Sequence, residues 1–83
     1  MLQVVAKVVR RMRRYLYELR KQNKMTQQDV ADRLKISRQY YGFVENGERK
    51  QEMSISMLCS FAEIFNTTVA DLVEAERNFS AAR

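Results

Sequence analysis

Apolar residues recur at alternating steps of three and four along the first part of the chain, the spacing of one face of an α-helix. We therefore predict a first helix that runs to about Gln22. Its stripe consists of Leu2, Val5, Val9, Met12, Leu16 and Leu19. Four valines lie between positions 4 and 9. Because β-branched residues favour strands, a short strand before the helix stays open as an alternative.

A second, shorter helix is expected after this one. Thr26 stands where an N-cap belongs, and Asp29 adds a carboxylate to the first turn. Hydroxyl caps and early carboxylates both stabilise the start of a helix, because they satisfy its free N–H groups and its dipole. The apolar face consists of Val30, Ala31 and Leu34.

A tight turn and a third helix follow. Residues 35–37 are too few for a loop, so we predict a turn there, with Ser37 as the cap of a helix over 38–45. This helix should point Tyr41 and Val44 inward. It should end at Asn46-Gly47, a pair suited to the left-handed conformation at a helix C-terminus.

Two further helices complete the expected all-α fold. Ser54 is placed to cap the fourth, Asn66 to end it, and Thr68 to Asp71 form a variant capping box for the fifth. The tail 78–83 is either an extension of this helix or a frayed end. The residues expected to face the core are Ile55, Leu58, Phe61, Ala62 and Phe65 in the fourth helix, and Val69, Leu72 and Val73 in the fifth.

Composition supports this helical reading. The chain has 83 residues, no proline and two glycines, whereas the turns of sheet proteins usually need more of both. The length allows one small domain. Cys59 is the sole cysteine and there is no histidine, which nearly excludes zinc sites and His-based catalysis. We expect Cys59 to be a core residue, and we expect no metal, no cofactor and no enzymatic activity.

Charge is divided along the chain. Residues 1–50 hold thirteen of the fifteen Lys and Arg but five of the ten Asp and Glu, so they carry a net charge of +8, whereas residues 51–83 carry −3. A basic half predicts a polyanionic partner, and both nucleic acid and an anionic membrane surface fit. The apolar runs are too short for a membrane span, and residues 1–9 lack the layout of a secretory signal. We therefore expect a cytoplasmic protein of prokaryotic or phage origin, with no membrane partner.

The most informative stretch is residues 26–47, two short helices joined by a three-residue turn. Its second helix opens with Ser37, Arg38 and Gln39. Arg suits the edge of guanine and Gln the edge of adenine, and a helix in the major groove presents its N-terminal residues to the bases. The stretch resembles the Cro and phage-repressor (XRE-like) type of helix-turn-helix. The resemblance extends over about 9–73 and is strongest at Thr26-Gln27, Ala31, Ser37-Arg38, Glu45-Asn46-Gly47, Phe61-Ala62 and Asp71-Leu72.

The resemblance implies a compact five-helix, repressor-like DNA-binding bundle. Its domain would span 9–75, with 1–8 as an N-terminal extension and 76–83 as a tail. Arg38, Gln39 and Phe43 would read bases, Phe43 through a thymine methyl group. Arg20 and Glu45 would form an internal ion pair. The residues that would contact phosphates are Gln27, Tyr40, Asn46, Arg49 and Lys50, although Tyr40 could instead pack at the helix edge.

Some positions depart from the family pattern. Position 35 is usually Gly, because the backbone turns left-handed there, and Lys35 would cost roughly 1 kcal/mol. The loop 48–53 is longer and lacks the usual proline. The arginine run 10–14 has three readings: a solvated helix face, added phosphate contacts, or another role of a basic helix such as membrane-surface binding.

These observations predict a sequence-specific transcriptional regulator, a repressor that occupies an operator on double-stranded DNA as a homodimer. The alternative is an antitoxin, or another protein-interaction module with a small protein partner, that reuses the fold. Apolar surface at Tyr40, Phe43, Phe79 and residues 2–9 would favour that alternative.

Overall fold

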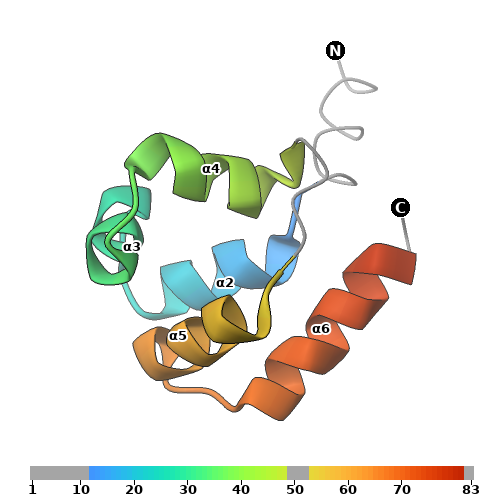
Figure 1. Cartoon of the computed structure of the whole chain (residues 1–83). Helices are drawn as coiled ribbons and strands as arrows, with labels where there is room; N and C mark the ends of the chain where they lie inside the picture. The colour runs from blue at the N-terminus through green and yellow to red at the C-terminus, as the bar shows by residue number, and fades with distance from the viewer. Residues whose placement is uncertain (1–11, 49–52, 82–83) are drawn as a thin grey trace.

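Five helices make up the part of the chain that the computed structural model describes, residues 12–48 and 53–81, and these ranges contain no strand. Figure 1 shows α4 along the upper edge, α2 in the middle, α5 below α2, and α6 at the lower right. The all-α, five-helix prediction is confirmed over these residues. The stripe at 2–9 and the alternative strand lie outside the described ranges. The helices are α2 (Arg14–Gln22), α3 (Gln27–Leu34), α4 (Arg38–Asn46), α5 (Ile55–Phe65) and α6 (Val69–Ala81).

A reciprocal capping box starts α3. The sequence predicts the Thr26 cap and the carboxylate of Asp29 in the first turn, and the structure adds the return bond from Asp29 to the Thr26 backbone. The backbone N–H of Asp29 donates to Thr26 Oγ1 over 3.1 Å, and the backbone N–H of Thr26 donates to Asp29 Oδ2 over 2.8 Å. The hydrogen bond from the Thr26 backbone lowers the pKa of Asp29. The first turn of α3 therefore begins at a defined residue, because two of its free N–H groups have acceptors.

Hydroxyl caps also start the three following helices. Ser37 Oγ accepts from the N–H of Tyr40 over 3.0 Å, and Ser54 Oγ accepts from the N–H of Met57 over 3.1 Å. Thr68 Oγ1 accepts from the N–H of Asp71 over 3.0 Å. Each expected cap is present, so local sequence decides where α4, α5 and α6 begin.

Left-handed residues end three of the helices. Gly47 (φ 69°) follows α4 and Asn66 (φ 54°) follows α5, as expected from their sequences. Lys35 (φ 60°, ψ 41°) follows α3. The chain therefore keeps the left-handed turn before α4 with a lysine, and the strain of a side chain in this conformation is built into the turn.

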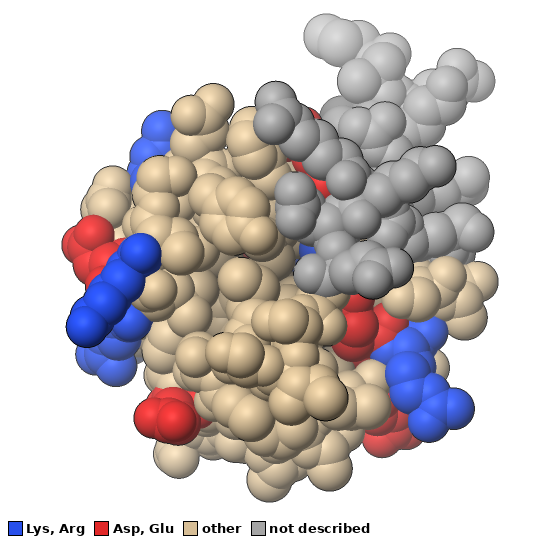
Figure 2. Space-filling view, in the orientation of Figure 1, with Lys and Arg blue, Asp and Glu red and all other residues tan. Residues whose placement is uncertain are grey.

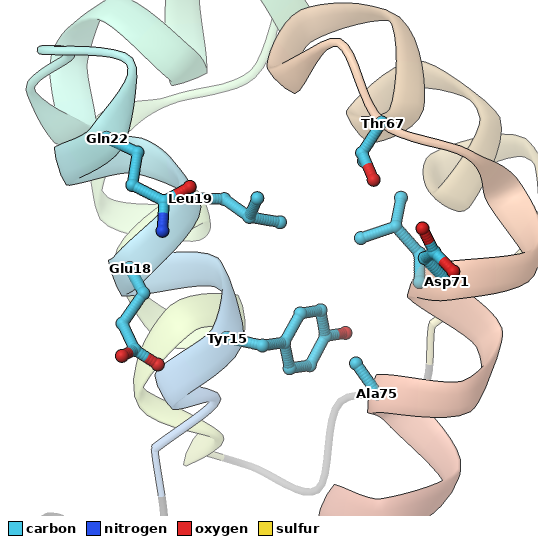
Figure 3. Close-up of a pocket in the computed structure, with 8 residues that line it drawn as sticks. Tyr15, Glu18, Leu19, Gln22, Thr67, Asp71 and Ala75 are labelled. Atoms are coloured by element: carbon cyan, nitrogen blue, oxygen red, sulfur yellow. The ribbon is translucent and has the colours of Figure 1, made fainter.

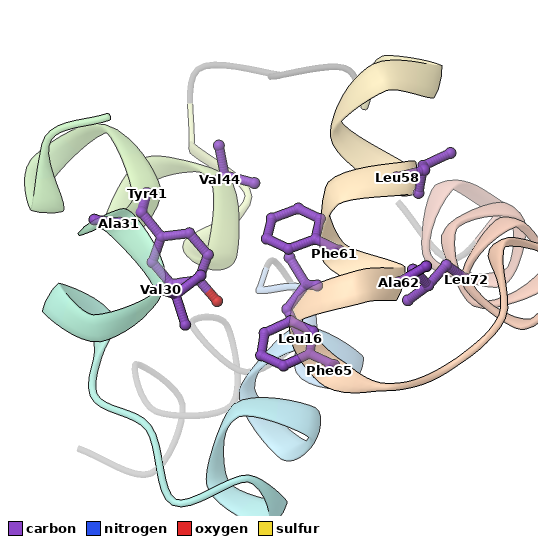
Figure 4. Close-up of a cluster of buried hydrophobic side chains, with 10 residues drawn as sticks. All are labelled: Leu16, Val30, Ala31, Tyr41, Val44, Leu58, Phe61, Ala62, Phe65 and Leu72. Atoms are coloured by element: carbon purple, nitrogen blue, oxygen red, sulfur yellow. The ribbon is translucent and has the colours of Figure 1, made fainter. Parts of the chain in front are cut away.

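The core lies among all five helices, around the aromatic ring of Phe61 (Figure 4). The Tyr41 ring meets that of Phe61 edge-on at 6.1 Å between centroids, and the Phe65 ring stacks on it at 5.7 Å. Such pairs add to the hydrophobic burial. The buried cluster is Leu16, Val30, Ala31, Tyr41, Val44, Leu58, Phe61, Ala62, Phe65 and Leu72.

Three expected core residues face solvent instead. Ile55 is 77% exposed, Val73 is 37% exposed, and Cys59 is exposed. Ile55 and Cys59 lie one turn apart beside the buried stripe of α5, on its solvent-facing edge. Val73 falls outside the line that α6 buries, which runs through Leu72 and Phe79. The predictions that these three residues pack inward were therefore wrong, because apolar character alone does not give the phase of a helix.

Among the described residues, no helix is long and apolar enough to cross a membrane.

Candidate nucleic-acid interface

The candidate site is built on two helices, α3 and α4, joined by the turn at 35–37. Ala31 in α3 is fully buried, and its small side chain lets α4 cross closely. The backbone N–H of Ile36 donates to the carbonyl of Ala31 over 3.0 Å, which closes the turn on the end of α3. The crossing angle is therefore set by a small residue and by a hydrogen-bonded turn, and α4 remains at the edge of the bundle (Figure 1).

The residues predicted to read bases lie on the first two turns of α4. Arg38 and Gln39 are both exposed, immediately after the Ser37 cap. Tyr40 is 37% exposed, and Phe43 is half-buried. The opposite side of α4 is occupied by buried Tyr41 and other core residues. The helix thus presents an arginine and a glutamine outward at its N-terminal end, where a groove-reading helix meets bases.

The residues predicted to contact phosphates surround this helix only in part. Gln27, the first residue of α3, is half-buried, and its Nε2 donates to Glu45 Oε2 over 3.1 Å. Gln27 Oε1 lies 3.8 Å from the position that a Cβ on Gly42 would occupy, so the Gln27 side chain lies over α4. Asn46 is exposed at the C-terminal end of α4. Arg49 and Lys50 lie outside the described residues.

A buried ion pair joins α2 to α4. Arg20 is 6% exposed and Glu45 is 1% exposed. Arg20 Nε donates to Glu45 Oε1 over 2.8 Å, and Arg20 Nη2 donates to Glu45 Oε2 over 3.0 Å. Arg20 Nη1 donates to the carbonyl of Met25 over 3.1 Å. The pair that the family resemblance implies is thus present as a two-pronged contact, the strong geometry for a guanidinium and a carboxylate.

Hydrogen bonds keep the Glu45 carboxylate ionised. Burial on its own would raise its pKa, but donors from Arg20, Tyr41 and Gln27 outweigh burial, so the pKa of Glu45 is lowered. The Tyr41 hydroxyl donates to Glu45 Oε1 over 2.8 Å. Burial and the neighbouring carboxylate raise the pKa of Tyr41. One carboxylate therefore ties α2, α3 and α4 together from inside the bundle.

A second buried arginine, missed at the level of sequence, also holds the C-terminal end of α4. Arg13 is 1% exposed, and its Nη1 donates to the carbonyl of Val44 over 2.7 Å. Its Nε and Nη2 donate to Glu76 Oε1 and Oε2 over 2.9 and 3.0 Å. Its guanidinium lies 4.7 Å from the ring centroid of Phe79. Arg13 thus joins the C-terminal end of α4 to α6.

This geometry corrects the reading of the arginine run. Arg13 is neither a solvated residue nor a phosphate contact, because its charge is paired inside the protein. Arg14 is exposed and lies 3.9 Å from Glu18, while positions 10 and 11 lie outside the described ranges. The sequence contains a signal that Arg13 is buried. It lies three residues before Leu16 and seven before Arg20, a spacing that places all three on one side of a helix.

A shallow groove of about 260 Å³ lies between α2 and α6 (Figure 3). Tyr15 and Leu19 line one wall, and the Tyr15 hydroxyl donates to Glu76 Oε1 over 2.6 Å. Burial and this carboxylate raise the pKa of Tyr15. Glu18 and Asp71 add negative charge to the lining. Because these carboxylates would repel phosphate, the groove does not fit the residues predicted to contact DNA.

Two short helices joined by a left-handed turn, with the second held from inside and its polar first turn exposed, define a helix-turn-helix protein. A helix-turn-helix family model matches residues 16–72, which is more than half of the chain. The chain therefore belongs to the helix-turn-helix family, in the Cro and phage-repressor type that its sequence resembles. It is a DNA-binding regulator, and the family is not typically enzymatic. Comparisons with characterised proteins and with solved structures give no match.

Proposed function

We propose that this protein is a sequence-specific transcriptional repressor that occupies an operator and reads its bases with α4. The exposure of Arg38 and Gln39 on the first turn of a helix that is fixed from behind carries this proposal. A guanidinium can donate twice to guanine, and a carboxamide can pair with adenine, so both side chains suit direct reading in the major groove. Phe43, one turn further along, would contact a thymine methyl group.

Contacts to phosphates would set the position of α4 in the groove. We assign this role to Gln27 and Asn46 at the two ends of the unit, and to Tyr40, whose side chain is in part exposed. The predicted roles of Arg49 and Lys50, which follow α4 in the sequence, remain part of the proposal. Such contacts orient a protein on the duplex but do not select a sequence.

The rigidity of α4 supports reading rather than general attraction. Glu45 is held from α2 and α3, and the Val44 carbonyl is held by Arg13. A base-reading side chain must be held to within a fraction of an ångström for both of its hydrogen bonds to form, and a fixed helix provides this accuracy. The exposed basic residues Arg33 and Lys35, near the turn, would attract DNA without selecting a sequence.

A homodimer is part of the proposed function. One module of this size makes few base contacts, whereas two copies related by a two-fold axis read half-sites about one DNA turn apart. The proposal also requires a compartment that contains DNA, and we place the protein in the cytoplasm of a prokaryotic cell.

The alternative of an antitoxin or other protein-interaction module receives less support. Phe79, one of the residues that would have supplied apolar surface for a partner, is buried against Arg13. Phe43 is half-buried. Among the described residues, the apolar surface available to a protein partner is thus smaller than the sequence predicts.

The experiment is selection of bound duplexes from a random pool, followed by titration of the selected and a scrambled duplex with variant proteins. We expect Arg38→Ala and Gln39→Ala each to reduce the ratio of the two affinities by roughly tenfold or more, since one two-pronged base contact contributes about 1–3 kcal/mol. Arg77→Ala, which removes an exposed arginine from α6, is the matched control and should leave the ratio unchanged.

Salt dependence separates base contacts from phosphate contacts. Loss of one phosphate contact should reduce the slope of log affinity against log salt by about one, whereas loss of a base contact should not. If the Arg38 and Gln39 variants, folded by circular dichroism, keep the same preference for the selected duplex, the assignment of α4 as the reading helix is wrong.

A further inference from the structure

Arg13 carries a charge inside the protein, where few of its charged residues lie. Among the described residues, the buried charged side chains are Arg13, Arg20 and Glu45. The others reach the surface, and Figure 2 shows those of one face. Arg20 pairs with Glu45, whereas Arg13 pairs with Glu76 of α6, whose side chain is 16% exposed. A buried cation is costly unless it is paired and hydrogen-bonded, so the surroundings of Arg13 must satisfy both its charge and its N–H groups.

Arg13 holds the C-terminal end of α4 with its backbone and with its side chain. The backbone N–H of Arg13 donates to the Glu45 carbonyl over 2.6 Å, and its Nη1 donates to the Val44 carbonyl over 2.7 Å. Both carbonyls belong to the last turn of α4, where the helix dipole favours a positive charge. Figure 1 shows the N-terminal end of α2 beside this end of α4, and Arg13 is the residue directly before α2.

Glu76 fixes the direction of the Arg13 guanidinium. Arg13 Nε donates to Glu76 Oε1 over 2.9 Å, and Arg13 Nη2 donates to Glu76 Oε2 over 3.0 Å. The Tyr15 hydroxyl donates to the same Oε1 over 2.6 Å, and the guanidinium lies over the Phe79 ring. A two-pronged contact gives a planar guanidinium one orientation, and in this orientation Nη1 reaches α4. Glu76 therefore acts on α4 through Arg13.

We propose that Arg13 and Glu76 are positioning residues for base reading, which hold α4 at the angle that its outward side chains need. The turn at 35–37 ties one end of α4 to α3, so the direction of the helix depends on what holds the other end. Side chains reach about 5–6 Å from a helix axis, so a tilt of about 10° moves their ends by roughly 1 Å. Hydrogen bonds form over about 2.7–3.2 Å, so such a displacement loses base contacts. This inference rests on the proposed function of α4.

Charge alone predicts the opposite effect of a change at Glu76. Loss of this carboxylate raises the net charge of +5 by one, which strengthens general attraction to DNA. Positioning predicts that binding to the selected duplex weakens at the same time. General destabilisation predicts that the affinities for all duplexes fall together, in proportion to the folded fraction. The three explanations thus differ in the sign of a measurable effect.

The test compares Glu76→Ala with Glu74→Ala. Both changes remove one carboxylate from α6, and Glu74 is exposed. We expect Glu76→Ala to lower the ratio of the affinities for the selected and the scrambled duplex about fivefold or more, the size of one weak base contact. Its affinity for the scrambled duplex should be unchanged or higher, and Glu74→Ala should keep the ratio of the parent chain. Circular dichroism checks folding, and Glu76→Gln, which keeps one acceptor oxygen, is a milder version of the change.

Arg13→Met tests whether Glu76 acts through Arg13. This variant should lose at least as much selectivity as Glu76→Ala, and the double variant should lose no more than Arg13→Met alone. Duplexes with single wrong base pairs provide a second readout. Arg38→Ala should remove the penalty at the base pair that it reads, whereas Arg13→Met should reduce the penalties at several base pairs, because the whole helix moves.

Amide hydrogen exchange of the free protein measures the hold on α4 without DNA. Glu76→Ala should speed exchange in α4 about tenfold relative to exchange in α3, because the end of α4 opens more often once Arg13 is released. Glu74→Ala should leave both rates unchanged.

Equal ratios in Glu76→Ala and Glu74→Ala, when the parent chain selects a duplex, would overturn this inference and leave the proposed function intact. Losses from Arg13→Met and Glu76→Ala that add in the double variant would also overturn it. A parent chain that selects no duplex would overturn the proposed function and the role of the pair in selectivity together. Faster exchange in α4 of Glu76→Ala would then still show that the pair holds the helix.

Discussion

The buried contact between Arg20 and Glu45 leads to a quantitative prediction about stability. Glu45 accepts two hydrogen bonds from Arg20, one from Tyr41 and one from Gln27. Removal of one partner of a buried ion pair costs about 3–5 kcal/mol, because the remaining charge stays buried without its counterion. We expect Arg20→Met and Glu45→Gln each to lower the free energy of unfolding by an amount near the lower end of that range.

The double variant should lose much less than the sum of the two single losses. It contains no unpaired buried charge, and Gln at position 45 can still accept from the Tyr41 hydroxyl. We therefore expect a coupling free energy of about 2 kcal/mol or more between the two positions. A chain of 83 residues has a total stability of roughly 4–12 kcal/mol, so each single variant should remain measurable at low temperature.

Urea unfolding followed by circular dichroism measures the four proteins of the cycle. The slope of the free energy against urea must be equal in all four for the comparison to be valid. If the loss in the double variant equals the sum of the single losses to within about 0.5 kcal/mol, Arg20 and Glu45 do not act as a pair. The description of Glu45 as the residue that joins three helices would then be wrong.

The contribution of Glu45 to the free energy of unfolding should depend on pH, and in opposite directions in the parent chain and in Arg20→Met. In the parent chain the pKa of Glu45 is lowered, so its stabilisation is complete above the unfolded value of about 4.3 and is lost as pH falls through the folded pKa. Without Arg20, burial is opposed by Tyr41 and Gln27 alone, and the pKa should rise. The contribution of Glu45 to stability in Arg20→Met should then decrease as pH rises.

Two further predictions concern α3. Lys35→Gly should raise the free energy of unfolding in urea by about 0.5–1 kcal/mol, because Gly adopts the left-handed conformation (φ 60°) without strain. Lys21→Gly, the same change inside α2, should lower it by a similar amount, and stabilisation by both or by neither would contradict this account. Asp29→Asn should lower the melting temperature at neutral pH, and the difference should vanish as pH falls through the lowered pKa of Asp29. A difference that is constant with pH would show that the capping carboxylate acts without its charge.

The helix boundaries could be predicted because local chemistry decides them. Thr26, Ser37, Ser54 and Thr68 each have an N–H group three residues later to bind. No distant residue is needed for such a bond. The left-handed ends follow the same logic where Gly or Asn is present, and at Lys35 the family resemblance supplied the expectation.

The tertiary contacts of the candidate site could be predicted only in part. The Arg13–Glu76 pair joins positions 63 residues apart, and nothing in the local pattern links them. Whether Cys59 and Val73 point outward depends on how α5 and α6 are rotated about their own axes. That rotation is the one that buries Phe61 in α5 and Leu72 in α6. An apolar residue at the edge of a stripe can lie on either side of that boundary, so composition cannot decide it.

The two buried arginines explain why α6 belongs to the reading unit although it lies far from α4 in sequence. Arg20 holds α4 through the Glu45 side chain, whereas Arg13 donates to the Val44 carbonyl near the C-terminal end of the helix, which also accepts from the backbone N–H of Gly47 over 3.2 Å. Because Glu76 neutralises Arg13 from α6, a helix that carries no proposed DNA contact fixes the end of the one that does. Basic charge in the sequence therefore has two separate roles: the interior guanidiniums hold the C-terminal end of α4, whereas in the proposed function the exposed basic residues on α3, the turn and α4 would meet the polyanion.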